Sequence, residues 1–82
     1  MPTVHRLGGL RVVIYPNDHQ PAHVHVIGGG SEAIFALHCP HGPPQLRLNY
    51  GFEYRDVNRI SDALAHVLPS LCAEWRNIHG SY

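Results

Sequence analysis

The residues of this chain best suited to chemistry lie between Pro16 and Val26, in the stretch Pro-Asn-Asp-His-Gln-Pro-Ala-His-Val-His-Val. This stretch holds three of the eight histidines and one aspartate. The candidate metal ligands are Asp18, His19, His23 and His25. Neutral imidazole binds Zn, Ni, Cu or Fe, and two histidines with one carboxylate form the ligand set of open zinc and iron(II) sites. The stretch is therefore a candidate site for a divalent transition metal.

The same residues have two other interpretations. His23 and His25 are two positions apart, which on a strand separates their Cβ atoms by ~7 Å and lets both rings approach one phosphate. Such a pair could supply the acid and base of a hydrolase acting on phosphoester bonds of RNA or a nucleotide. In a purely structural interpretation, Asp18 accepts a hydrogen bond within the turn and the two histidines line an exposed sheet face or a dimer contact.

Two β-prone runs, residues 3–7 and 10–15, flank Gly8-Gly9. This pattern predicts a hairpin, because both central residues of a type I′ turn need positive φ. The expected cross-strand pairs are Leu7 with Leu10, Arg6 with Arg11, His5 with Val12 and Val4 with Val13. Alternation then gives one face to Leu7, Leu10, Val12 and Ile14, and the other to Arg6, Arg11, Val13 and Tyr15. On that second face, Arg6, Arg11 and Tyr15 are candidates for binding an anion or RNA, although a solvated pair of arginines is the simpler interpretation.

Alternation also predicts three further strands. The third, residues 23–27, turns Val24 and Val26 towards the core and both of its histidines to the opposite face. Three glycines permit a sharp reversal into a strand over 32–37, whose inward residues are Ala33, Phe35 and Leu37. The proline-rich segment 38–44 is expected to be a loop, and residues 46–50 a short fifth strand.

The hydrophobic period changes at about Tyr54. Apolar residues then recur at steps of three and four, at Val57, Ile60, Leu64, Val67, Leu71, Trp75 and Ile78. This spacing predicts one long helix with an apolar stripe. Pro69 lies inside it and predicts a kink or a break, because proline removes one backbone hydrogen bond and clashes with the preceding turn. Gly80 is the expected C-cap.

Together these elements predict a single small α+β domain over residues 1–82. Its expected architecture is a four- to five-stranded antiparallel meander sheet with one long C-terminal helix packed on one face. The expected core residues are Val12, Ile14, Val24, Val26, Phe35, Leu64, Leu71 and Trp75. The other sheet face, with Val13, Tyr15 and Ile27, is expected to be covered by a second subunit or another partner.

The composition of the chain limits its candidate partners and its expected location. The formal net charge is zero, whereas nucleic-acid binders usually carry a basic excess, so nucleic acid is a secondary candidate partner. No apolar stretch approaches the ~20 residues of a membrane helix, and no secretion signal is recognisable. Cys39 and Cys72 are too few for a disulfide framework. We expect them to be reduced thiols in a cytoplasmic protein.

Three motifs carry a resemblance to a known family. They are Met-Pro-Thr-Val-x-Arg-x-Gly-Gly at the start, Asn-Asp-His-x-Pro-x-His-Val-His-Val over 17–26, and Gly51-Phe52 before the helix. With these the chain closely resembles a family of short bacterial proteins of unknown function. The resemblance implies a single cytoplasmic domain, often encoded beside a small protein with a helix-turn-helix-like region, as in toxin–antitoxin pairs. It implies no catalytic residue.

Three hypotheses follow. The first is an interaction module of a toxin–antitoxin-like pair, whose partner is the helix-turn-helix-like neighbour or a second copy of the chain. The second is a metal-binding protein that uses the histidine stretch. The third is a small hydrolase with His23 and His25 as its catalytic residues. A similarity of residues 21–29 to the active-site strand of histidine-triad nucleotide hydrolases adds little, because Pro21 stands where the first histidine of that motif belongs.

Overall fold

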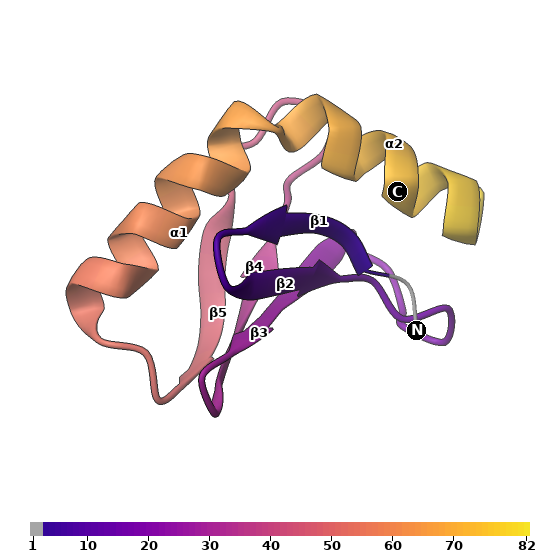
Figure 1. Cartoon of the computed structure of the whole chain (residues 1–82). Coiled ribbons are helices and arrows are strands. Elements are labelled where there is room, and N and C mark those ends of the chain that lie inside the picture. The colour runs from indigo at the N-terminus through magenta and orange to yellow at the C-terminus, as the bar shows by residue number, and fades with distance from the viewer. Residues whose placement is uncertain (1–2) are drawn as a thin grey trace.

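The computed structural model describes residues 3–82, which form five strands followed by two helices (Figure 1). The strands are β1 (Thr3–Leu7), β2 (Leu10–Val13), β3 (His23–Gly28), β4 (Ser31–Ala36) and β5 (Gln45–Tyr50). The helices are α1 (Tyr54–His66) and α2 (Leu68–His79). The strands form one antiparallel sheet in the order β1-β2-β3-β4-β5. The α+β class and the antiparallel meander are therefore confirmed.

The β1–β2 hairpin has three of the four predicted pairs, up to His5 opposite Val12. The fourth pair is wrong: Val13 lies opposite Thr3, because the register shifts between Thr3 and His5. The turn type also differs. Gly8 has a φ of 60° and Gly9 has no positive φ, whereas type I′ needs positive φ at both central residues, so the turn is not type I′.

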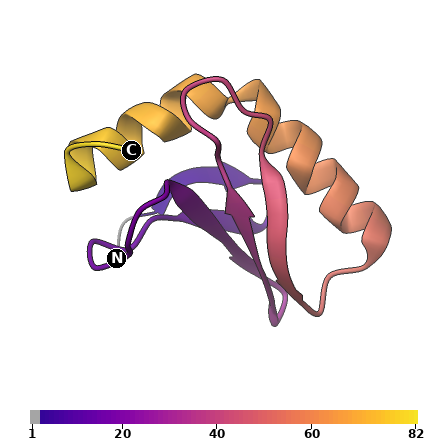
Figure 2. The ribbon, with the colours of Figure 1, turned by 180° about the vertical axis from the view of Figure 1, so that it is seen from behind.

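The two helices cover one face of the sheet in both views of the ribbon (Figures 1 and 2). The inward side chains of β2, β3 and β4 meet the apolar stripe of the helices there. All eight predicted core residues belong to one buried cluster and are at most 1% exposed: Val12, Ile14, Val24, Val26, Phe35, Leu64, Leu71 and Trp75. The predicted core is therefore confirmed, and the hydrophobic effect of this burial holds the two layers together.

The prediction of one long helix is wrong. Helix α1 ends at His66, Val67 has a non-helical backbone (φ −115°, ψ 16°), and α2 begins at Leu68. The break places Pro69 in the first turn of α2, where its missing N–H is not needed. The apolar stripe continues across the break, with Leu64 and Leu71 in the same core cluster. The predicted break and the Gly80 C-cap are confirmed, with Gly80 in the left-handed conformation at φ 86°.

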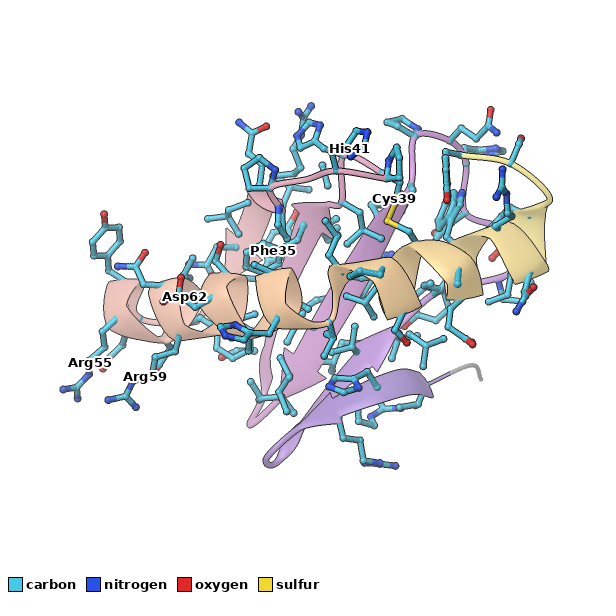
Figure 3. The ribbon with its side chains drawn as sticks, turned by 90° about the horizontal axis from the view of Figure 1, so that it is seen from above. Phe35, Cys39, His41, Arg55, Arg59 and Asp62 are labelled. Atoms are coloured by element: carbon cyan, nitrogen blue, oxygen red, sulfur yellow. A yellow bond between two sulfur atoms is a disulfide. The ribbon has the colours of Figure 1, made fainter. Side chains whose placement is uncertain are left out.

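Another wrong prediction concerns the cysteines. Cys39, in the loop after β4, is disulfide-bonded to Cys72 on α2, with the two sulfurs drawn beside the helix in Figure 3. Cys72 was expected to be a reduced thiol near the helix stripe. It does lie there and is 2% exposed, but the loop folds back over the helix and brings Cys39 to it. The expected cytoplasmic location was based partly on reduced cysteines, and the bridge removes that support.

The sheet face away from the helices is more covered than expected. Val13 was predicted to lie exposed on it and is fully buried. Val13 is the cross-strand partner of His25. The Tyr15 ring and the Glu32 carboxylate also contact His25. Side chains of the sheet itself therefore shield this part of the face. We call this face the outer face.

Strand β5 forms one edge of the sheet, and all six of its residues are exposed. The large apolar side chains among them are Leu46, Leu48 and Tyr50, which are 38%, 48% and 59% exposed. Within residues 3–82, neither helix has the length and apolar character required to cross a membrane.

Candidate metal centre

The candidate centre is formed by the turn after β2 and by the first half of β3. The turn closes on itself, because Asp18 N–H donates to the Tyr15 carbonyl (3.0 Å) and Tyr15 N–H donates to Asp18 Oδ2 (3.1 Å). These two bonds hold the Asp18 carboxylate over the start of β3, where His23 and His25 lie on the same face by alternation. Asp18 thus has the structural role considered for it, and its carboxylate also faces both histidines.

Three side chains converge. Asp18 Oδ2 lies 3.4 Å from His23 Nε2 and 3.3 Å from His25 Nε2. One potential ligand atom from each residue falls within 4.8 Å of the other two. The side chains of Asp18, His23 and His25 are 16%, 21% and 12% exposed, so the cluster is largely withdrawn from water but still reachable.

The outer hydrogen bonds of the histidines decide which ring nitrogen faces the cluster. His23 Nδ1–H donates to the Pro21 carbonyl, and His25 Nδ1–H donates to Glu32 Oε2, both at 2.9 Å. Carbonyl and carboxylate oxygens only accept, so each Nδ1 carries a hydrogen. In the neutral rings, both Nε2 lone pairs therefore point at the Asp18 carboxylate. Histidines that ligate a metal have this arrangement, with the second ring N–H bonded to a carboxylate or backbone carbonyl.

The cluster leaves one nitrogen without a partner. His25 Nε2 is buried and has no hydrogen-bond partner, and its 3.3 Å approach to Asp18 does not have hydrogen-bond geometry. An unpaired buried polar atom costs about 1–3 kcal/mol. With both rings neutral, two lone pairs and a carboxylate face one another, and all three are acceptors that a shared cation would bind. The chemistry of the donor set and its geometry both suit a divalent transition metal.

Aromatic rings surround the histidines. The Tyr15 ring lies edge-on to His25 at 4.8 Å between centroids, and the Trp75 ring lies 5.2 Å from His23. The contact with Trp75 corrects the expectation that both histidines lie away from the helix. Helix α2 extends over the β2–β3 turn (Figure 1), where His79 Nε2–H donates to the Tyr15 carbonyl at 3.2 Å. His23, at the start of β3, is therefore close enough to contact the helix.

The other predicted site residues lie outside this cluster. His19 is exposed on the turn and is not among the three converging residues. Arg6 and Arg11 are cross-strand neighbours, as the register predicted, and Tyr15 contacts His25. The metal role of His19 and the anion-binding roles of Arg6, Arg11 and Tyr15 stay predictions.

Sequence reasoning missed Glu32, the carboxylate that orients His25. The signal was present in the alternation of β4. If Ala33, Phe35 and Leu37 point inward, Glu32 points to the outer face, and the tight turn after β3 brings it near His25. The register confirms this placement, with Ile27 opposite Glu32 and His25 opposite Ile34. Glu32 is therefore a diagonal neighbour of His25 on one face.

The fold and the cluster define a class: a small α+β protein with a two-histidine, one-carboxylate group on a meander sheet. Residues 9–76, most of the chain, match the family model described as "Domain of unknown function (DUF4160)". The chain belongs to this family. No protein among those of curated function and no solved structure matches it.

Proposed function

We propose that the protein binds one divalent transition metal through Asp18 Oδ2, His23 Nε2 and His25 Nε2. The observation that carries this proposal is the buried, unpartnered His25 Nε2 facing a carboxylate, with its Nδ1–H held by Glu32. Two histidines and one carboxylate leave further coordination positions for water or a substrate. A metal held there would supply a bound water as a nucleophile, and hydrolysis of a phosphoester is the enzymatic activity that this would serve.

The test is a titration of Zn²⁺, Ni²⁺ and Cu²⁺ against the wild-type protein and His25→Ala. Trp75 is the single tryptophan, and its ring lies 5.2 Å from that of His23, so its fluorescence reports directly on the cluster. We expect Cu²⁺ and Ni²⁺ to quench it. Zn²⁺ should raise the free energy of unfolding by about 2.7 kcal/mol at a metal concentration 100 times its Kd. His25→Ala should weaken binding by about 100-fold or more, since a lost ligand costs at least as much as a lost outer-shell partner.

Two controls separate the cluster from histidine binding in general. His41→Ala removes an exposed loop histidine (Figure 3) and should leave the affinity unchanged. His19→Ala should also leave the metal affinity unchanged if Asp18, His23 and His25 are the only protein ligands. It should weaken the affinity if His19 is a fourth ligand. Binding should fall as the solution is acidified, because protons compete for the same nitrogens. Equal responses of the wild type and His25→Ala would contradict the proposal.

The Glu32 carboxylate provides a finer prediction. Glu32→Gln keeps the size of the side chain and an acceptor oxygen but removes the negative charge behind His25. We expect the metal affinity to fall by about 10-fold, at the lower end of outer-shell effects, with little change in stability without metal. Asp62→Asn is the matched control, because Asp62 lies exposed on α1 (Figure 3). Isothermal titration of the three proteins measures the effect, and equal affinities would remove Glu32 from the site.

A second candidate function is recognition of a protein partner. The observation that favours it is the apolar surface of the β5 edge, with Leu48 and Tyr50 both about half exposed. We propose that a small helix-turn-helix-like protein or a second copy of the chain pairs with this edge, in the cytoplasm of a bacterium, as in a toxin–antitoxin pair. Co-expression with the neighbouring protein and size-exclusion chromatography test this. Loss of the complex in Leu48→Lys would support it. A chain that elutes as a monomer at high concentration, with its elution volume unchanged by the neighbour, would contradict it.

A further inference from the structure

A pocket of about 500 Å³ lies beside the cluster of Asp18, His23 and His25. Its walls come from the turn before β3, from β4, and from the loop that follows β4. His23 is the one residue that the pocket shares with the cluster of Asp18, His23 and His25. Much of its lining is apolar, including Ala22, Ile34 and Ala36. A pocket of this volume is in the range that holds a small organic molecule rather than a bare ion.

Arg47 on β5 is the one residue lining this pocket whose side chain is permanently charged. The other lining side chains include no aspartate or glutamate within the described residues. Arg47 makes no ion pair with any of residues 3–82, whereas Asp18 and Glu32, the acidic side chains of the sheet half, are both engaged with histidines. Nothing in the sheet half of the chain therefore neutralises Arg47.

Arg47 lies at an irregularity in the pairing of β4 with β5. Leu48 lies opposite Ile34 and Leu46 lies opposite Phe35, so Arg47 is the extra residue at a register shift between β4 and β5. A bulge of this kind redirects a side chain from the face that strict alternation would give it. Because Phe35 belongs to the core and Ile34 lines the pocket, Leu46 and Leu48 pair with residues on opposite faces of β4, so alternation from one leucine gives Arg47 a different face from alternation from the other. Arg47 lies among the residues that line the pocket.

The rim of the pocket has a second unusual feature. His38 has a φ of 52°, the one non-glycine residue with positive φ among the described residues. Such a conformation is disfavoured for residues with a Cβ and occurs where the surrounding structure holds it in place. Here the Gly42 N–H donates to the His38 carbonyl (2.7 Å), His38 Nε2–H donates to Gln45 Oε1 (2.9 Å), and the next residue is the disulfide-bonded Cys39. The rim is therefore held in one shape before any ligand arrives.

We infer that this pocket binds a small organic anion, with its oxyanion head on Arg47 and its apolar body against Ala22, Ile34 and Ala36. The planar guanidinium group can donate two parallel hydrogen bonds to the oxygens of a carboxylate or of a phosphate ester, so either head group could bind in the same way. The site goes beyond the proposed metal function. In this assignment the head group is held by Arg47 and not by His23, which the pocket shares with the cluster, so anion binding does not require the metal.

The experiment measures binding of benzoate, phenyl phosphate and neutral benzamide to metal-free protein in the presence of EDTA, by isothermal titration. We expect at least one of the two anions to bind and benzamide to bind about ten-fold or more weakly, since charge-assisted hydrogen bonds are the strong ones. The tighter of the two anions identifies the head group. Arg47→Gln should weaken anion binding by a similar factor, and Arg6→Gln, an exposed arginine outside the pocket, should not.

Three results would overturn the assignment: benzamide binding as tightly as the anions, no binding of either anion, or equal anion affinities for the wild type and Arg47→Gln. Arg47 is exposed, so its substitution should leave the fold intact, which circular dichroism checks. His25→Ala separates this site from the metal site. It should lose metal binding and keep anion binding, and a loss of both would place the anion on the metal cluster instead.

Discussion

Trp75→Ala is expected to lower the free energy of unfolding by about 3–5 kcal/mol, the usual cost of truncating a large buried aromatic residue. Trp75 is 0% exposed within the core cluster. Its indole N–H donates to the Ser81 carbonyl at 2.9 Å, and its ring stacks on His79 at 3.9 Å between centroids. Domains commonly have only about 5–15 kcal/mol of stability in total, so this variant should be marginally folded.

Urea unfolding followed by far-ultraviolet circular dichroism measures this effect, because the variant has no tryptophan fluorescence. Tyr54→Ala is the control, since Tyr54 also lies on a helix but is 82% exposed. It should change stability by no more than about 0.5 kcal/mol. If Trp75→Ala and Tyr54→Ala unfolded at the same urea concentration, helix α2 would not pack on the sheet as described.

Opening the Cys39–Cys72 disulfide is expected to cost about 3–4 kcal/mol. The bridge spans a sequence separation of 33, and a cross-link of this length removes chain entropy of that order from the unfolded state in the loop-closure description. It also ties the loop after β4 to helix α2 (Figure 3). The measurement is urea unfolding with and without a phosphine reductant.

The double variant Cys39→Ser, Cys72→Ser is the control for the reductant. It should be as unstable as the reduced wild type and should not respond to the reductant. Alkylation followed by mass spectrometry gives an independent check, because a bridged protein takes up the reagent only after reduction. Free thiols in the untreated protein, with an unchanged unfolding midpoint, would restore the expectation of two reduced cysteines.

The sequence was sufficient to predict the features that depend on local periodicity. Alternation over 23–27 separated Val24 and Val26 from His23 and His25, and the helical spacing from Val57 onward identified the residues that cover the sheet. Pro69 and Gly80 marked the break and the end of the helical segment for reasons internal to the backbone. The spacing also predicted that Asp18, His23 and His25 lie close together, because one short turn and one strand carry them, but it included His19, which does not join them.

Other features depended on contacts between residues distant in the sequence. Whether Cys39 reaches Cys72 depends on how the proline-rich loop folds over α2, and no local pattern specifies that path. The same holds for Trp75 against His23, which requires α2 to extend past the start of β3. Val13 lies on the predicted face, but its burial was not predicted, because burial there depends on which side chains surround His25.

The sequence by itself determined the strands, the helical segments and the core, because each is specified by spacing along a short stretch, and it limited the candidate metal ligands to four residues of that kind. Only the tertiary structure decided the orientation of the two imidazoles, through Pro21 and Glu32, and the pocket that Arg47 lines. The physical reason is that ring orientation and pocket shape depend on hydrogen bonds and register shifts between strands, which strict alternation does not encode.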